Sequence, residues 1–236
     1  MINNNPQIST FTLLRFSGFK DTFWIFSQMG LAPKEFSKVP GLQFFKLLGS
    51  GNKDGFGKLL NPNVYAFHGV WESENAAFDF FESSPQFEPF RMRATEIGTF
   101  FMNVIKAHGK WSGVNPYLTN DEYGEGKIAV ITRARIKITY IPQFWKYVAP
   151  VSGVLAHQPG VILSIGIGEY PWFMQATFSL WENVESMREY AYKNKLHTEV
   201  ISKTRKLGWY SEELFANFDP YKFKGKWDGK TTLTQF

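Results

Sequence analysis

The chain has four histidines and no cysteine, so a bound metal would have to be held by histidine, carboxylate or tyrosine. One histidine continues a stripe at three- and four-residue steps that is typical of one helix face: Met187, Tyr190, Asn194, His197 and Ile201. A neutral imidazole on such a face needs a hydrogen-bond partner or a metal. We therefore consider two interpretations of His197, a buried histidine bonded to a carbonyl and a metal ligand.

No two histidines have a spacing that would place them together on one helix as metal ligands. A single-histidine site points to haem b, because the porphyrin supplies four further ligands to the iron. His197 is then the candidate iron ligand. We expect His68 to be a hydrogen-bonded residue of the core or of a sheet edge, and His108 and His157 to be solvated or capping residues.

Three cations are candidate partners for the propionates of a haem. Arg15 and Arg133 lie near the ends of two expected strands, where each could pair with a carboxylate through two hydrogen bonds or lie on the surface. Lys46 interrupts the apolar run FFKLL. It could extend from a strand edge to solvent, or reach an anionic group in a cavity.

Other chemistries lack their motifs. The sequence has neither a G-x-S-x-G elbow nor a G-x-G-x-x-G loop after a strand, and Glu72 and Glu182 are better explained as helix-capping residues than as acid–base catalysts. The net charge of +5 is mild, and no nucleic-acid-binding module surrounds the lysine clusters. These lysines are solvated faces, or a basic rim that docks an acidic electron carrier.

The N-terminal residues lack the basic and apolar parts of a signal peptide, and no apolar run is long enough to span a membrane. We therefore expect a cytoplasmic protein. An apolar substrate could still bring it to a membrane surface.

The same landmarks occur twice in the same order, at offsets of roughly 110 to 121 residues. This indicates a duplicated unit, with a first repeat at 10–113, a second repeat at 127–229 that carries His197, and a Gly-, Asn- and Pro-rich linker at 111–126. The landmark pairs are Phe23-Trp24 and Phe144-Trp145, Pro40-Gly41 and Pro159-Gly160, Gly49 and Gly168, Trp71-Glu72 and Trp181-Glu182, and the motifs Gly109-Lys110-Trp111-Ser112-Gly113 and Gly225-Lys226-Trp227-Asp228-Gly229.

Each unit is predicted to run strand, helix, strand, strand, helix, strand, which is a ferredoxin-like order. In the first unit we expect a helix over 21–29 that ends at Gly30, and one helical block over 74–90. The predicted class is α+β, with two sheets that pack or close into a barrel, the helices outside and a cavity between sheet and helices. Superposing Trp71 on Trp181 places Phe87 opposite His197, so an aromatic side chain in one unit corresponds to a possible ligand in the other.

Several segments resemble the spheroidene monooxygenase family of carotenoid biosynthesis, and the resemblance runs from about residue 10 to residue 227. The most specific segments are FSQMGLA at 26–32 and GEYPW at 168–172. Further similarity covers Pro40-Gly41-Leu42, Lys46 to Gly51, Ser179-Leu180-Trp181, Ala191-Tyr192 through His197, Gly208-Trp209 and Glu212-Glu213-Leu214.

The resemblance implies a haem protein of the dimeric α/β-barrel kind, here with two tandem ferredoxin-like repeats in a single chain. It implies that an acyclic carotenoid receives a keto group beside a terminal methoxy group, with dioxygen and electrons from a reduced ferredoxin. It also implies an iron-ligating histidine on the helix after the third strand of one repeat, which is His197 here. No family motif fixes the distal residues, so Arg15, Lys46 and Arg133 stay candidates on their residue types alone.

Three functions remain open at this stage. The first is a haem-dependent monooxygenase acting on an elongated apolar, carotenoid-like substrate. The second is a haem lyase such as an aldoxime dehydratase, in which His68 or Arg133 would supply the acid. The third is a non-catalytic protein that carries haem or a lipophile. The duplication allows a barrel within one chain, so a homodimer is not required, although exposed aromatic residues could drive one.

Overall fold

The computed structural model describes residues 7–52, 59–120, 126–155, 157–170, 172–193, 203–204 and 206–236. In this part of the chain, eight strands form one closed barrel in the order β1-β3-β2-β6-β7-β5-β8-β4. Every neighbouring pair is antiparallel. The strands are β1 (Ile8–Arg15), β2 (Leu42–Gly51), β3 (Leu60–Trp71), β4 (Glu96–Gly109), β5 (Ile128–Ile136), β6 (Val161–Tyr170), β7 (Met174–Trp181) and β8 (Tyr210–Gly225).

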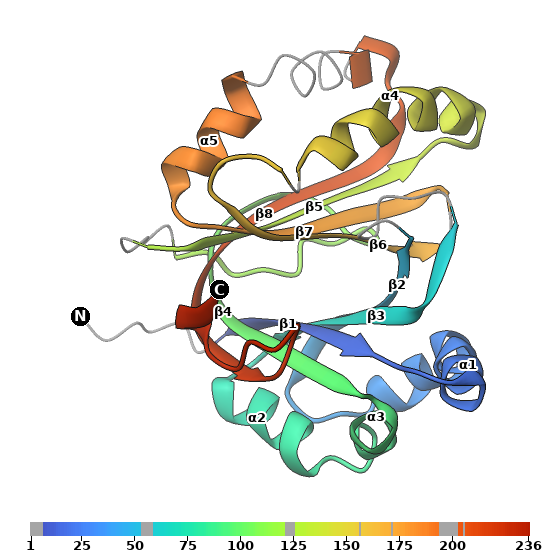
Figure 1. Cartoon of the computed structure of the whole chain (residues 1–236), viewed down its shortest axis with the longest axis vertical. Helices are drawn as coiled ribbons and strands as arrows, with labels where there is room; N and C mark the ends of the chain where they lie inside the picture. Colours follow the sequence, from blue (N-terminus) through green and yellow to red (C-terminus); the bar gives the residue numbers. More distant parts are fainter. Residues whose placement is uncertain are drawn as a thin grey trace.

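The helices lie outside the barrel, in two layers (Figure 1). One layer covers the half formed by β1 to β4, and the other covers the half formed by β5 to β8. The protein is thus of the predicted α+β class. The helices are α1 (Phe19–Phe36), α2 (Glu74–Ser83), α3 (Glu88–Arg93), α4 (Ile141–Leu155) and α5 (Val184–Lys193), with short 3₁₀ turns η1 (Ile138–Tyr140) and η2 (Leu233–Gln235).

Two predicted helix boundaries are wrong, each for a local reason. Helix α1 continues through Gly30 and Pro33 to Phe36, because its buried residues Ile25, Ala32 and Phe36 keep one face on the sheet. The block expected over 74–90 is split into α2 and α3, because Ser84 precedes a proline and is extended, with φ −64° and ψ 128°. Among the described helices, none is both long and apolar enough to cross a membrane.

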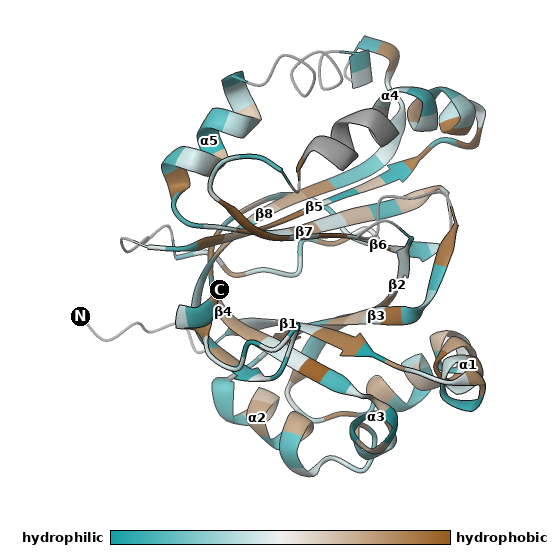
Figure 2. Ribbon diagram, in the orientation of Figure 1, coloured by the Kyte–Doolittle hydropathy of each residue, from teal (hydrophilic) through white to brown (hydrophobic). Residues whose placement is uncertain are grey.

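Strands β1 and β3 bury both of their faces over most of their length, and Figure 2 shows hydrophobic segments on the barrel strands of both halves. Inward-facing residues such as Phe11 and Phe178 fill the barrel, where these two rings stack 3.9 Å apart between centroids. Outward-facing residues of the first half, such as Phe67, pack on Phe80 and other helix residues in one continuous aromatic layer. Among the described residues of the second half, the apolar contacts between helices and sheet form two clusters.

The two Gly-Lys-Trp turns close the barrel strands in the same way. Trp111 bridges to Val114 and Trp227 bridges to Lys230, and both indoles are buried. A side chain at Gly109, whose φ is +94°, would collide with the backbone carbonyl of Glu213. The predicted linker therefore does more than connect, because Trp111 and Tyr117 belong to the barrel core.

Candidate functional site

Four charged side chains meet at one end of the barrel, and we call Arg133, Lys46, Glu169 and Glu212 the barrel-end cluster. Arg133 faces inward from β5 and is only 4% exposed. Its guanidinium contacts Glu169 from β6 at 3.3 Å and forms a second ion pair with Glu212 from β8. Lys46, from β2, lies 2.8 Å from the other oxygen of Glu169. The charges balance as two cations and two carboxylates, which is the condition for burying them.

The first Gly-Lys-Trp turn completes this cluster with neutral donors. The indole Nε1 of Trp111 donates to Glu169 at 2.8 Å, and the Nζ of Lys46 donates to the hydroxyl of Ser112 at 2.7 Å. The backbone N–H groups of Ser112 and Gly113 donate to Glu212 at 3.0 and 2.6 Å. Burial alone would raise the pKa of Glu212, but these N–H groups and Arg133 together hold it below its ordinary value.

One buried donor in the cluster is not used. The Nε of Arg133 is buried and has no hydrogen-bond partner among the described residues. Beside Glu212 the surface is hollowed by an open depression of about 380 Å³, lined by the end of β4 and the start of β8. Solvent can therefore approach the cluster from the side of Glu212.

A second polar group, His68, lies deeper in the barrel. His68 is fully buried, with Nδ1 2.9 Å from the carbonyl oxygen of Thr10 and Nε2 2.8 Å from the hydroxyl of Tyr117. Its ring stacks on Trp111 at 5.6 Å. Burial lowers the pKa of His68 to about 4, so the imidazole is neutral at pH 7. The prediction of a hydrogen-bonded core histidine is confirmed.

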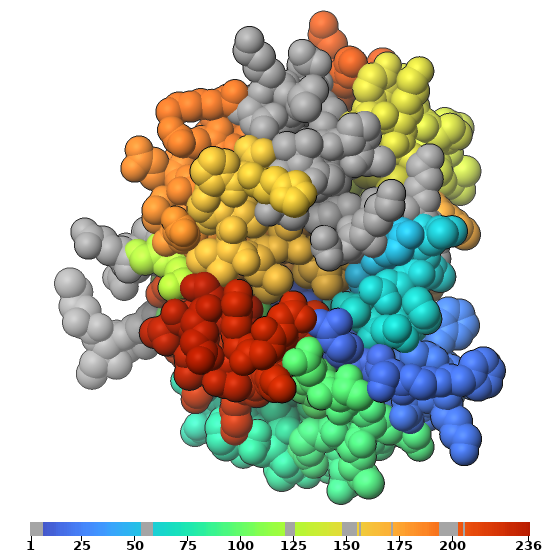
Figure 3. Space-filling view, in the orientation of Figure 1, coloured from blue at the N-terminus to red at the C-terminus, as the bar shows by residue number. Residues whose placement is uncertain are grey.

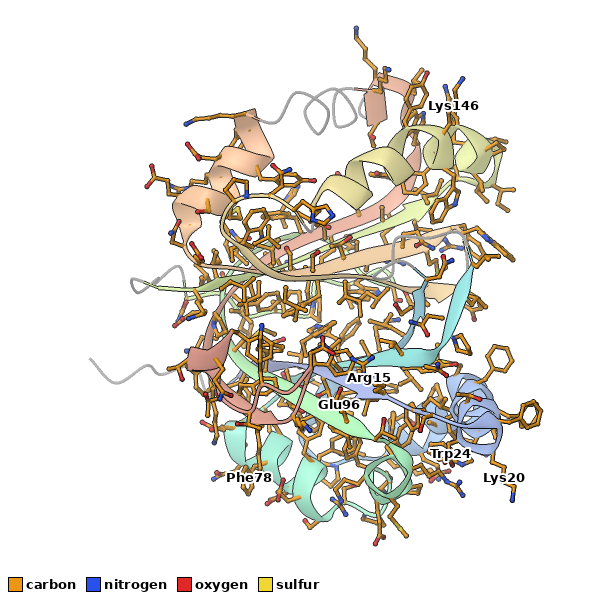
Figure 4. All side chains as sticks on the ribbon, viewed as in Figure 1. Arg15, Lys20, Trp24, Phe78, Glu96 and Lys146 are labelled. Carbon is orange, nitrogen blue, oxygen red and sulfur yellow. The ribbon has the colours of Figure 1, made fainter. Side chains whose placement is uncertain are left out.

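Arg15 lies apart from these groups. It pairs with Glu96 at 2.9 Å and with Asp228 at 2.5 Å, and its guanidinium lies 4.3 Å from the ring centre of Trp227 (Figure 4). Its side chain is 34% exposed. The strand register explains the difference, because Arg15 is the last residue of β1 whereas Arg133 lies three residues before the end of β5.

Of the sequence-predicted residues, the structure thus joins Arg133 and Lys46 through Glu169 and leaves Arg15 elsewhere. Of the two interpretations of Lys46, the structure shows the one in which it reaches an anionic group, here the carboxylate of Glu169. His197 lies outside the described residues, as does the segment around it. His108 and His157 are exposed, and no cluster of three metal-ligating side chains occurs within the described part of the chain.

Sequence reasoning missed the partners of the cations. Glu169 and Glu212 carry the cluster, and Trp111 and Tyr117 complete its surroundings. Both glutamates stand in segments already distinguished by their sequence, GEYPW and Glu212-Glu213-Leu214. The presence of both glutamates in these segments was the sequence feature that could have identified them.

On the outer face of the second half-sheet, one threonine is exposed where the threonine at the same step of the first half is buried. Ile8 pairs with Trp71 in the first half and Ile128 pairs with Trp181 in the second, so Thr12 and Thr132 stand at the same step, four residues on. Thr12 is fully buried beneath the helices, whereas Thr132 is exposed.

The residues beside Thr132 also differ between the two halves. The row across the first half reads Leu47, Phe67, Thr12 and Thr99, and all four are buried. The corresponding row across the second half reads Gly166, Thr177, Thr132 and Phe215. Gly166 is buried, Thr177 is half-buried, and Thr132 and Phe215 are exposed. Glycine thus takes the place of leucine in the second row, and the phenylalanine lies on the other side of the threonine.

No family model matches the chain. The spheroidene monooxygenase of Rhodobacter capsulatus is 33% identical over 229 residues, which are 96% of this chain and 95% of that protein. The protein of the same name from Cereibacter sphaeroides is 32% identical over 95% of this chain and 70% of its own length. That of Rubrivivax gelatinosus is 31% identical over 81% of this chain and 73% of its own length.

Among solved structures, an aldoxime dehydratase in complex with butyraldoxime has a TM-score of 0.64 at 8% identity, covering 93% of this chain and 81% of that one. A second aldoxime dehydratase has a TM-score of 0.59 at 12% identity, covering 92% and 82%. These identities establish a shared fold and nothing more. The sequence relatives are decisive, because their similarity extends over nearly the whole chain. The chain belongs to the spheroidene monooxygenase family.

Proposed function

We propose that this protein is a haem-dependent monooxygenase that oxidises an elongated, carotenoid-like substrate. Dioxygen and electrons from a reduced ferredoxin-like donor would be its co-substrates, and haem b its cofactor. The names of the sequence relatives support the monooxygenase assignment and the carotenoid as substrate. The exposure of Thr132, where its counterpart Thr12 is fully buried, is the observation that carries the haem assignment.

We also propose that the barrel consists of two tandem ferredoxin-like repeats, 10–113 and 127–229. The order of elements supports this, because each half runs strand, helix, strand, strand, helical segment, strand. The second helical segment of the first half consists of α2 and α3. The counterpart glycines Gly49 and Gly168 pair directly with each other where β2 meets β6.

Under this proposal the haem would lie on the outer face of the second half-sheet. Gly166, Thr177 and Thr132 are small residues on three neighbouring strands, so their side chains would leave room for a flat macrocycle against this face. When bound, the haem would supply the activation of dioxygen at its iron. The chain's own part is to exclude water and to hold the apolar substrate, for which exposed Phe215 offers a contact surface.

The duplication supports His197 as the iron ligand. Counting sixteen residues from Trp71 leads to Phe87, and the same count from Trp181 leads to His197. Phe87 is 1% exposed and packs against Phe80, Phe81 and Phe90 between helices and sheet. His197 is thus the sequence counterpart of a position that is buried in the first half.

The three cations were expected as propionate partners. Arg133 and Lys46 face the barrel interior, the opposite side of the sheet from Thr132, and their charges are already matched by Glu169 and Glu212. Arg15 is matched by Glu96 and Asp228. We therefore assign all three to holding the barrel ends and none to the propionates.

Haem titration of the apoprotein tests the ligand. We expect the wild type to give a Soret band that shifts on reduction and on carbon monoxide binding, and His197→Ala to lose or alter this spectrum while keeping its far-ultraviolet circular dichroism. His108→Ala and His157→Ala are the matched controls, because both histidines are exposed and should leave the spectrum unchanged. A folded His197→Ala protein with the wild-type spectrum would refute the ligand.

A second variant tests the location of the haem. Thr132→Phe would place a large apolar side chain on the outer face of the second half-sheet, as Phe67 and Leu47 do on that of the first. It should therefore block haem binding, with unchanged or higher thermal stability. Thr132→Ser keeps a small side chain at this position and should bind haem normally. Equal binding by both variants would exclude this face.

The substrate is tested with the haem-loaded protein, spheroidene, a reduced ferredoxin and dioxygen. A keto product that requires dioxygen and reductant supports the monooxygenase. Turnover of an aldoxime without dioxygen or reductant would support the lyase, since an aldoxime dehydratase has the same fold. Against the lyase, its candidate acids His68 and Arg133 are buried inside the barrel, away from the open face. Haem binding with neither activity would indicate a carrier of haem or lipophile.

A further inference from the structure

Helix α1 exposes an aromatic stripe where a surface helix normally presents polar side chains. Phe19, Phe23 and Phe26 are 86%, 66% and 62% exposed. At about 100° per residue these three side chains fall within an arc of roughly 60°. The opposite face of the helix carries the buried residues Ile25, Ala32 and Phe36. The stripe therefore points directly into solvent, and we call it the α1 stripe.

Unpaired positive charge lies beside the α1 stripe. Lys20 and Lys34 are exposed, and no described carboxylate forms an ion pair with either. The acidic residues of the helix are neutralised, since Asp21 pairs with Arg93 at 2.8 Å and Glu35 with Lys38 at 2.9 Å. The net charge next to the aromatic stripe is consequently positive.

Further exposed apolar residues lie on the same side of the molecule. In Figure 1, α1, the end of β2 with the start of β3, the end of β6 with the start of β7, and the segment that leads into α4 all lie on the right-hand side. Figure 3 shows α1 and the beginning of β3 on this rim. Lys20 on α1 and Lys146 on α4 extend outward from it (Figure 4). The exposed apolar residues of the other three segments are Leu59 (70%), Leu60 (52%), Ile138 (79%), Tyr170 (57%) and Trp172 (53%).

We propose that this side of the protein docks on the surface of an anionic lipid bilayer, with the α1 stripe inserted at the level of the headgroups. A helix whose aromatic face is flanked by lysines is the usual arrangement for binding in the plane of an interface. The lysines add attraction to anionic lipid. A second copy of the chain fits less well, because a two-fold contact would bring the same unpaired lysines of both copies together.

This proposal goes beyond the proposed reaction and does not require it. Docking would hold the exposed face around Thr132 close to the membrane, in which an apolar carotenoid-like molecule is dissolved. The test uses neither haem nor carotenoid, so its failure would leave the proposed reaction untouched, and failure of the reaction would leave the docking surface untouched.

Co-sedimentation with vesicles tests the proposal. We expect the full chain to sediment with vesicles containing phosphatidylglycerol, and more weakly with pure phosphatidylcholine. Phe23→Ser should lower the partition coefficient about tenfold, from the apolar area withdrawn from lipid. The triple variant Phe19→Ser/Phe23→Ser/Phe26→Ser should abolish sedimentation. Lys20→Gln should weaken binding to phosphatidylglycerol vesicles about fivefold and hardly affect binding to phosphatidylcholine.

Phe78→Ser is the matched control, because Phe78 is an exposed phenylalanine on α2, far from α1 in Figure 4. It should bind vesicles as the wild type does. The temperature of thermal unfolding should be unchanged in all of these variants. If the triple variant does not fold, Phe23→Ser alone tests whether the α1 stripe binds the vesicles. Undiminished binding by Phe23→Ser would overturn the proposal. So would a solution dimer that Phe23→Ser dissociates, because the stripe would then join two copies.

Discussion

Replacing Arg133 by methionine removes the central cation of the barrel-end cluster. Removing one partner of a buried ion pair typically costs about 3–5 kcal/mol, because a charge is left uncompensated. Here Glu169 retains Lys46 at 2.8 Å and Glu212 retains two backbone N–H donors, so part of the penalty is avoided. We expect Arg133→Met to lower the free energy of unfolding by about 2–3 kcal/mol at pH 7.

Arg15→Met is the matched control for this change. Arg15 also pairs with two carboxylates, but its side chain is 34% exposed, whereas that of Arg133 is 2% exposed. Exposed pairs contribute about 0–1 kcal/mol. Chemical denaturation of both variants with urea measures the difference. A loss in Arg133→Met no larger than in Arg15→Met would refute the reasoning that burial makes the cluster costly to break.

The dependence of this loss on pH gives a second test. The pKa of Glu212 is held below its unfolded value of about 4.3, so its ionisation stabilises the protein above that pH, and the contribution is lost as the pH falls through the folded pKa. Without Arg133 the carboxylate of Glu212 takes up a proton more readily. The deficit of Arg133→Met should therefore shrink as the pH is lowered toward 4. A deficit that grows on acidification would contradict the charge-based explanation.

Three further changes test the packing around the cluster. Tyr117→Phe leaves Nε2 of His68 without its partner at 2.8 Å and should cost about 1–3 kcal/mol in urea denaturation, whereas Tyr192→Phe, at a 77% exposed position, should cost nothing measurable. Because His68 has a pKa of about 4 in the folded protein against about 6.5 unfolded, wild-type stability should fall by about 3 kcal/mol between pH 6.5 and 4, and His68→Gln should remove this slope. Gly109→Ala should destabilise the protein by more than about 2 kcal/mol, because its Cβ would collide with the carbonyl of Glu213 and its φ is +94°. Gly30→Ala, in a helix where no atom lies near the new Cβ, should stabilise the protein slightly. Thermal melts measure both effects.

The order of strands and helices was predictable because alternation and helical spacing are local properties of the sequence. The helix predicted over 21–29 lies within the observed α1 (Phe19–Phe36) for this reason. Closure of the barrel was harder to predict, since it depends on contacts such as that between Gly49 and Gly168, which are distant in sequence. Local reasoning identified these two glycines as counterparts but gave no sign that they would pair with each other.

The candidate site shows the same division. The position of Lys46 in an apolar run was a local anomaly that left two outcomes open, solvent or an anionic partner, and the structure shows the second. The identity of that partner was not predictable, because Glu169 arrives on a strand of the other half. Trp111 and Tyr117 were assigned to a linker on the basis of neighbouring Gly, Asn and Pro, a composition that indicates turns. They are buried instead, because the end of the barrel needs apolar side chains to fill it.

The two halves of the barrel differ on both of their faces. On the outside, Leu47 of the first half corresponds to Gly166 of the second and the phenylalanine of the row moves from Phe67 to Phe215, so the second half has one large apolar side chain fewer. On the inside, Leu13 of the first half corresponds to Arg133, so the second half has gained a charge. Both changes weaken a folding unit, because one reduces apolar burial and the other requires buried carboxylates as partners. The continuous aromatic layer of the first half can offset them, since the closed barrel joins both halves into one cooperative structure. The exposed Thr132 and the small residues beside it are our physical reason for proposing the haem site on this outer face and not inside the barrel.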